Sequence, residues 1–236
     1  MVLDDETGRI VWVGEGRDEE SLNRFFQGMT DEERGQIEAV ALDMWRPYIN
    51  SVSHYCINAK IVYDLFHVVK DFNRVIDKIR NQEYHRARAE GKEVIKGSKY
   101  LLLKNHEHLS TDDRVRLKEL INLNEKLALV HILKDDLKKI WDYRYRAWAE
   151  RALEEWCAIA YESGLRDLIS FADKLARHKD GILNHCNYPI HTSWLEGVNN
   201  TIKVIKRKAY GFRDTDYFIL KIKQAFPGTN YTNGIK

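Results

Sequence analysis

The chain has 236 residues, of which 44% are hydrophobic, enough to bury the core of one large domain or two small ones. Charged residues make up 31% and prolines number only three, a composition that indicates a largely helical globular protein and excludes extensive disorder. The formal net charge of +2 excludes a protein that attracts nucleic acid through its overall charge, so any such surface must be local.

The cysteines and the hydropathy pattern indicate the compartment. Cys56, Cys157 and Cys186 are far apart and form no CxxC pair, which argues against a zinc knuckle or a disulfide framework. We therefore expect buried thiols in a reducing compartment. The sequence has neither an apolar run of membrane-spanning length nor a signal-peptide pattern, so we predict a cytoplasmic protein with no membrane partner.

The first residues predict a hairpin followed by two helices. Short apolar runs at 1–3 and 9–13 flank a turn at Gly8, which can adopt the positive φ that a tight turn requires. Asp18 is suited to cap a helix, and a second short helix is expected after Thr30. Together with the strands that follow, this alternation predicts an α/β fold.

Two later apolar runs each end in an acid. Residues 37–42 predict a strand that is buried on both faces and closed by Asp43, and residues 59–63 predict another that is closed by Asp64. Open α/β sheets bind ligands at the carboxyl ends of their strands, so Asp43 is a candidate site residue. The alternative is that Asp43 caps the helix that begins near Pro47.

Asp64 and His67 are three residues apart where this second strand gives way to a helix. Once the helix has begun, this spacing can bring both side chains to one side. The alternative is that Asp64 is a helix cap and His67 makes an ordinary hydrogen bond within the protein.

From Lys70 to about residue 185, long amphipathic segments replace the α/β pattern and predict an all-helical insertion. Trp141, Trp148 and Trp156 fall in one broad apolar stripe, and we expect them to be core residues rather than platforms for nucleic-acid bases. The predicted organisation is residues 1–70 and 186–226 for the α/β domain, 71–185 for the insertion and 227–236 for a flexible tail.

The segment 191–214 predicts a helix with one apolar and one polar face. Ser193 and Glu196 have the spacing of a capping box at its start. The apolar face comprises Leu195, Val198, Ile202 and Ile205, and the other face carries Glu196, Asn199, Asn200, Lys203 and Arg207. One carboxylate followed by amides and cations suits a metal or a phosphate. The alternative is that Glu196 only completes the capping box and that the cations form a solvated face.

Four blocks of sequence carry a resemblance to a known family. They are ALDMWRPYI at 41–49, DLFHVVK at 64–70, KGSKYLLLKN at 96–105 and HTSWLEGVNNTIKVIKRKAYGFRDTDYF at 191–218. With these motifs the chain resembles the DDE transposases of the ISL3 insertion-sequence family over most of its length. The resemblance implies an RNase H-like fold interrupted by a large helical insertion. It also implies DNA as the partner, both insertion-sequence ends and target DNA, and a prokaryotic protein associated with the nucleoid.

The resemblance also implies a site. In the family three acids hold two Mg²⁺ (or Mn²⁺) ions for phosphoryl transfer. Asp43 resembles the second acid and Glu196 the third, so both are expected to be catalytic metal ligands. Asp64 and His67 match the family's D-x-x-H signature and are expected to support the site. Cationic residues are expected to contact the DNA backbone, namely Lys203, Lys206, Arg207 and Arg213.

The start of the chain departs from the family pattern. The family's first acid lies on a strand before the hairpin, and neither Asp4 nor Asp5 corresponds to it. The usual N-terminal zinc-binding and helix-turn-helix modules are also missing. We therefore expect a truncated, inactive copy that would bind metal only with a complete acidic triad. The alternatives are a non-catalytic remnant that binds DNA or a partner subunit, and a plain α/β protein whose acids are all helix caps. The resemblance also implies a homo-oligomer, since transposases of this type commonly act as multimers.

Overall fold

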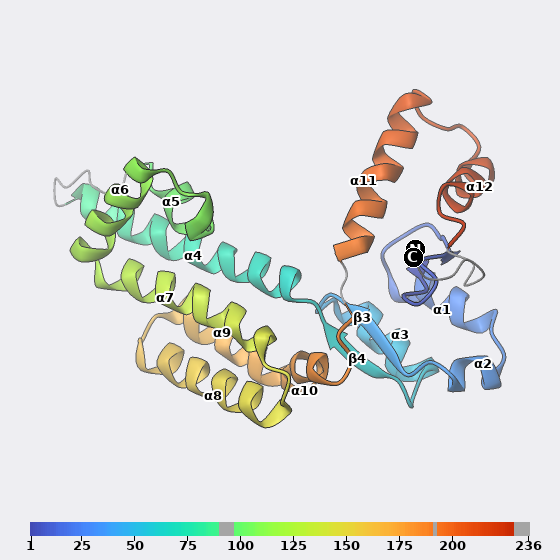
Figure 1. Ribbon diagram of the computed structural model, residues 1–236, viewed down its shortest axis with the longest axis horizontal. Coiled ribbons are helices and arrows are strands. Elements are labelled where there is room, and N and C mark those ends of the chain that lie inside the picture. Colours follow the sequence, from blue (N-terminus) through green and yellow to red (C-terminus); the bar gives the residue numbers. More distant parts are fainter. Residues whose placement is uncertain (90–96, 191–192, 229–236) are drawn as a thin grey trace, which may run out of the picture. The chain divides into compact units, whose positions relative to one another are not determined.

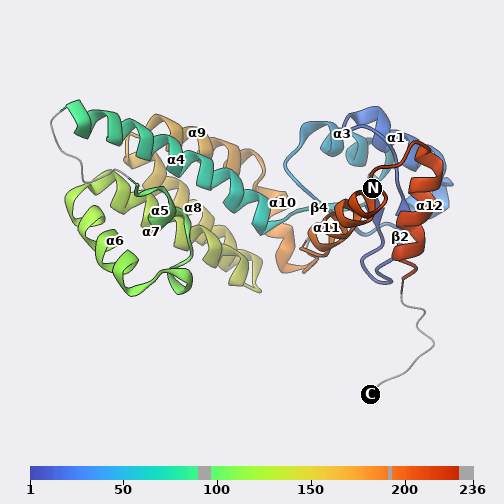
Figure 2. The ribbon, with the colours of Figure 1, turned by 90° about the horizontal axis from the view of Figure 1, so that it is seen from above.

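The computed structural model describes residues 1–89, 97–190 and 193–228 and divides the chain into two compact units (Figures 1 and 2). One unit comprises Met1–Asp64 with Ile190–Lys236, and the other comprises Leu65–Pro189. The chain is mixed α/β and mostly helical, with all its described strands in the first unit. None of the described helices is both long and apolar enough to cross a bilayer.

The strands of the first unit form two separate pairs among the described residues. β1 (Val2–Leu3) pairs antiparallel with β2 (Ile10–Trp12), as the hairpin prediction required, and Gly8 has a φ of 66° in the turn. β3 (Ala39–Leu42) and β4 (Lys60–Tyr63) form a parallel pair. The predicted strands are thus confirmed.

The prediction that the first parallel strand is buried on both faces is wrong. In β3 only Leu42 is buried, and Ala39, Val40 and Ala41 are half-buried. The physical reason is the width of the sheet, because a pair of strands leaves each member with one unpaired edge and with less cover on its faces.

The first two helices begin where the sequence predicts, and the predicted cap at Asp18 is confirmed. The Asp18 side chain accepts a hydrogen bond from the Ser21 backbone N–H (2.8 Å) at the start of α1 (Glu19–Gln27). Thr30 forms a capping box with Glu33 at the start of α2 (Asp31–Gly35). α3 (Arg46–Tyr55) follows β3, has Pro47 in its first turn and packs on α1.

Two helices near the end of the chain cover the hairpin (Figure 1). They are α11 (Ser193–Lys208) and α12 (Thr215–Ala225), which contribute Val198 and Ile222 to a small core around Ile10. The partly buried residues packed against this core are Met1, Leu3, Val13, Ile202, Phe218 and Phe226. Segments almost 200 positions apart in the sequence therefore share one core, which places α11 firmly in the α/β unit.

Every described element of the second unit is a helix. The α-helices are α4 (Leu65–Ala89), α5 (Lys99–Leu103), α6 (Thr111–Leu123), α7 (Glu125–Lys139), α8 (Arg146–Glu162), α9 (Arg166–Arg177) and α10 (Lys179–Leu183). Short 3-10 turns lie at His106–His108, Ile140–Asp142 and Asn184–Cys186. In the centre of the unit, the rings of Phe72, Trp156 and Phe171 are in mutual contact.

The tryptophan prediction holds for Trp156 and fails for Trp148. Trp156 is buried, and its indole N–H donates to the Leu133 carbonyl (2.7 Å), whereas Trp141 is half-buried and stacks on His185. Trp148 is 59% exposed. The helix expected to run through this stripe is interrupted between α7 and α8, so the helical periodicity does not carry over and Trp148 falls on an outer face.

The cysteines are free, as expected, but not all are buried. Cys56 and Cys157 are buried, and burial raises the pKa of the Cys157 thiol to about 11. Cys186 is only half-buried, because it lies in the turn that follows α10. Its sulfur is close to the Tyr143 carbonyl (3.4 Å).

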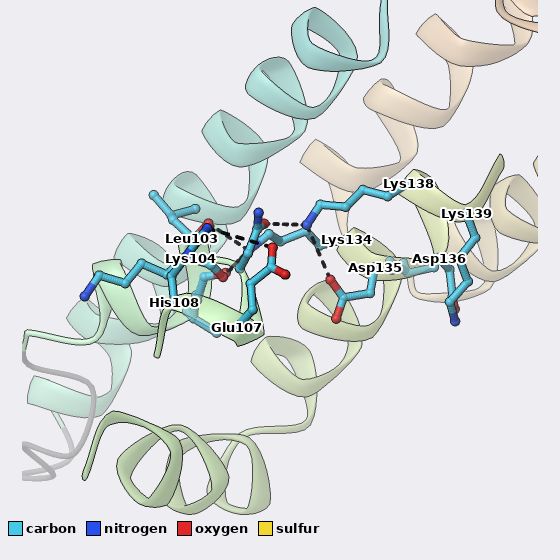
Figure 3. A network of polar contacts seen from close by, with 12 residues as sticks. Leu103, Lys104, Glu107, His108, Lys134, Asp135, Asp136, Lys138 and Lys139 are labelled. Carbon is cyan, nitrogen blue, oxygen red and sulfur yellow. Dashed lines mark hydrogen bonds and ion pairs between the residues drawn. The ribbon is translucent and has the colours of Figure 1, made fainter. Parts of the chain in front are cut away.

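A buried lysine in α7 closes the end of α5 (Figure 3). The Lys134 ammonium donates to the carbonyls of Leu102 (2.9 Å), Leu103 (2.7 Å) and Lys104 (2.7 Å), which are acceptors that a helix leaves unpaired at its C-terminus. Burial lowers the pKa of Lys134 to about 8, which leaves it mainly protonated at neutral pH and able to donate three hydrogens.

We expect Lys134→Met to lower the free energy of unfolding at neutral pH by about 2–3 kcal/mol, because three carbonyls lose a charged donor. The matched control is Lys138→Met one turn later, where a partly exposed lysine contacts Asn105 and Asp135 and the loss should stay below about 1 kcal/mol. Thermal and urea unfolding measure both. Equal effects of the two substitutions would contradict the assigned role of Lys134.

Candidate functional site

The parallel pairing of β3 and β4 brings two acids to one edge. Leu42 is opposite Tyr63 at the last paired position, so Asp43 and Asp64 follow at equivalent positions on neighbouring strands. Adjacent strands are about 4.8 Å apart, so the backbones of these two residues lie next to each other across the pair. The predicted strand-end acids are therefore together at the carboxyl end of the pair, where open α/β sheets bind ligands.

The Asp43 side chain is not a helix cap. The N-cap of α3 is Trp45, and no side chain makes a capping hydrogen bond there. The Asp43 Oδ1 atom is shielded from solvent and has no hydrogen-bond partner in the described part of the chain. A buried carboxylate oxygen without a partner is costly, so this atom fits a ligand better than a structural role.

Tyr48 and Arg17 were not identified as site residues from the sequence. Burial raises the pKa of the Tyr48 phenol; the hydrogen-bonded Arg17 guanidinium acts in the opposite direction, and the Asp43 carboxylate adds to the increase. The Tyr48 phenol is therefore hydrogen-bonded to Arg17 and under the electrostatic influence of Asp43. The Trp45 indole N–H donates to the Arg17 carbonyl (3.0 Å) and fixes this loop beside α3. Only the folded loop reveals this neighbourhood, since Arg17 is in no motif.

The oxygens at this edge suit a hard divalent cation. Mg²⁺ and Mn²⁺ prefer carboxylate oxygens, and the partnerless Oδ1 of Asp43 provides one. Asp64 is also buried, at 5% exposure. The residues that the structure describes contain no group of three or more acidic, histidine or cysteine side chains arranged to hold a metal.

Glu196 and His67 complete the residues expected at the site. Glu196 belongs to α11, in the same unit as Asp43, but its side chain lies outside the described residues, as does that of Ser193. The capping box and the metal role of Glu196 both remain predictions. His67 lies in the first turn of α4, in the helical unit, where its ring meets the Phe66 ring edge-on.

α11 has the two faces that the sequence predicts. Val198 is fully buried, and Leu195, Ile202 and Ile205 are half-buried on the inner face. The exposed residues are Asn199, Asn200, Lys203, Lys206, Arg207 and Lys208, followed by Arg213 after the helix.

The cations of α11 differ from those of the helical unit in their partners. Within the described residues, none of Lys203, Lys206, Arg207 and Arg213 makes an ion pair with a carboxylate. In the helical unit many cations do, as in Arg74–Asp71, Lys99–Asp77 and Lys126–Glu83. Lys206, Arg207 and Lys208 complement the helix dipole in the last turn of α11, but Lys203 and Arg213 lie outside that turn. The face suits phosphate groups.

Comparison with known proteins identifies the relatives of this chain. The model of the ISL3 family, described as a transposase, matches residues 1–222. The transposase for insertion sequence element IS1001 of Bordetella parapertussis is 43% identical over 231 residues, which cover 97% of this chain and 57% of that protein. The transposase for insertion sequence element IS1557 of Mycobacterium tuberculosis is 25% identical and aligns with 93% of this chain and 54% of that protein. No solved structure matches the chain.

We expect Asp43→Asn to raise the free energy of unfolding by about 1 kcal/mol without divalent cations, because it replaces a half-buried carboxylate that has one shielded oxygen without a hydrogen-bond partner. Mg²⁺ should raise the melting temperature of the wild-type chain and leave that of the variant unchanged. Asp5→Asn, an exposed acid of the same unit, is the control and should behave as wild type. An equal Mg²⁺ effect on Asp43→Asn would exclude Asp43 as a ligand.

Proposed function

Because this chain belongs to the ISL3 family of transposases, we propose that it performs DNA strand cleavage and joining at the ends of an insertion sequence by metal-dependent phosphoryl transfer. The chain spans about half the length of the curated relatives it matches. The observation that carries the proposal is the buried Asp43 oxygen that has no partner at the end of β3.

In this proposal Asp43 and Glu196 hold Mg²⁺ or Mn²⁺. Bound metal ions would activate the attacking oxygen and stabilise the leaving oxygen of an in-line displacement. Asp43 supplies a preformed ligand because its carboxylate oxygen is already removed from water. Glu196 is on a helix that is anchored to the hairpin core through Val198, two residues further on, which fixes its backbone within the same unit.

The overall arrangement supports an RNase H-like domain. A hairpin, a parallel pair with an acid at its end and a later helix that carries Glu196 all belong to one unit. The chain leaves this unit after Asp64 and returns to it at Ile190, with helices throughout the described part of the intervening segment. This is the order of elements expected for an RNase H-like domain with a helical insertion.

Asp64, His67 and Arg17 are assigned supporting roles. Asp64 is buried at the end of the neighbouring strand and adds negative charge at the edge where a cation would bind. His67 follows in the first turn of α4 and, with Asp64, forms the D-x-x-H pair. Arg17 is exposed next to Tyr48 and is suited to contact a phosphate that approaches this edge.

The exposed face of α11 binds the DNA backbone. Lys203, Lys206, Arg207 and Arg213 are exposed and have no carboxylate partners among the described residues. Charges of this kind bind phosphates without reading the base sequence and release counterions as they do so. The same observation supports a second candidate function, a chain that binds DNA through α11 without catalysing the reaction.

We expect Asp43→Asn and Glu196→Gln each to reduce Mg²⁺-dependent nicking of a plasmid that carries the insertion sequence by more than about 100-fold, with DNA binding retained. Asp5→Asn should keep full activity. Unchanged nicking in either acidic variant would exclude the assignment. A wild-type chain that binds this plasmid but does not nick it would support the non-catalytic function, together with the expectation of an inactive copy.

The phosphate contacts predict a specific salt dependence. The affinity for duplex DNA falls as salt rises, and the slope of log affinity against log salt concentration measures the number of phosphate contacts. In a variant that carries Lys203→Ala, Lys206→Ala and Arg207→Ala, the magnitude of this slope should decrease by about 2.7, at about 0.9 for each lost contact. The control removes three cations that are paired within the helical unit, Arg74, Lys139 and Arg151, and leaves the slope as in wild type. Equal slopes for all three proteins would exclude α11 as the binding face.

A further inference from the structure

The turn after α11 holds a tyrosine that packs against nothing. The Tyr210 side chain is fully exposed, at 102% of the reference value. Its φ is 52°, and it is the one non-glycine residue with a positive φ in the described part of the chain. Left-handed backbone is unfavourable for a residue with a Cβ, and a tyrosine that buries no ring surface gains nothing from packing to offset it.

The turn is a Schellman motif, in which glycine usually occupies the position of Tyr210. The Gly211 N–H donates to the Lys206 carbonyl (2.9 Å), and the Tyr210 N–H donates to the Arg207 carbonyl (3.1 Å). Glycine would adopt this conformation without strain. The identity of residue 210 is therefore not explained by the local fold, and strain of this kind is frequent at functional positions.

The residues after Tyr210 hold the turn in place. The Phe212 ring stacks on that of Phe218 (4.7 Å between centroids) and approaches that of Tyr217. The Asp214 side chain accepts a hydrogen bond from the Tyr217 backbone N–H (3.0 Å) at the start of α12. Because Phe212 packs inward while Tyr210 does not, the turn presents the phenol ring to solvent from a fixed backbone.

Cationic residues flank Tyr210 in the sequence. Lys206, Arg207 and Lys208 precede Tyr210, and Arg213 follows it, all of them exposed and without carboxylate partners among the described residues. Lysine is depleted at the centres of protein interfaces, so Lys206 and Lys208 beside the ring favour a nucleic acid over a protein partner. An aromatic ring beside a row of cations is the combination that binds single-stranded nucleic acid, with bases on the ring and phosphates on the cations.

We propose that Tyr210 stacks on an unpaired base of the bound DNA while the flanking cations hold the adjoining phosphates. The inference rests on the proposed binding of DNA by α11 and adds a preference for DNA with unpaired bases, such as a frayed or single-stranded end. A phenol ring can stack on any base, so this contact selects for an unpaired state and not for a sequence.

The test measures the affinity of the 236-residue chain for two DNAs, a blunt duplex and the same duplex extended by a single-stranded 3′ tail. Tyr210→Gly should weaken binding to the tailed DNA by about tenfold, within the range of one base–aromatic stack, and leave the blunt duplex nearly unaffected. Tyr210→Trp should retain the wild-type preference for the tailed DNA over the blunt duplex. Tyr210→Gly also removes the backbone strain, so its melting temperature should equal or exceed that of wild type, which excludes unfolding as the cause.

Tyr100→Ala is the matched control, because Tyr100 is also an exposed tyrosine but belongs to the helical unit beside a lysine that is paired with Asp77. It should bind both DNAs as wild type does. If Tyr210→Gly binds the tailed DNA as tightly as wild type, or loses the same factor on both DNAs, the stacking proposal is wrong while DNA binding by α11 stands. If the wild-type chain binds neither DNA, both proposals fail together.

Discussion

The in-register parallel pairing of β3 with β4 is the constraint on which the candidate site depends. Parallel strands end at the same edge, so closing each strand with an acid necessarily puts Asp43 and Asp64 side by side. Two carboxylates at one edge repel each other unless cations or protons intervene. The fold keeps this arrangement although one Asp43 oxygen is buried without a hydrogen-bond partner. A buried oxygen of this kind is expected in a side chain that binds a cation.

The cations of the helical unit and those of α11 differ in whether carboxylates pair with them. In the helical unit, acids and bases are paired across helices, as in Lys174–Asp71, and even the buried Lys134 has all three hydrogens donated. On α11 the exposed cations are left without carboxylates among the described residues. Pairing rigidifies and neutralises a scaffold, whereas unpaired charge is available to a partner. The net charge of +2 conceals this contrast because it averages over both units.

Local chemistry made much of the fold predictable, and tertiary contacts account for the rest. The caps at Asp18 and Thr30 and the hairpin follow from residue types at fixed spacing. The exposure of Trp148 could not be foreseen, since it depends on where the chain interrupts a helix. For the site, the sequence identifies Asp43 as the end of a strand, but the approach of Arg17 and Tyr48 requires the folded loop.

Asp43 and Tyr210 are both in locally unfavourable conformations or environments. One has a buried oxygen without a hydrogen bond, the other a left-handed backbone with a ring that packs on nothing, and each lowers the stability of the unit that contains it. Local rules favour a satisfied side chain at residue 43 and glycine at residue 210. Departures from local consistency tend to gather where a protein acts, and both departures belong to the α/β unit. A cation at the first and an unpaired base at the second would turn each unfavourable feature into a contact.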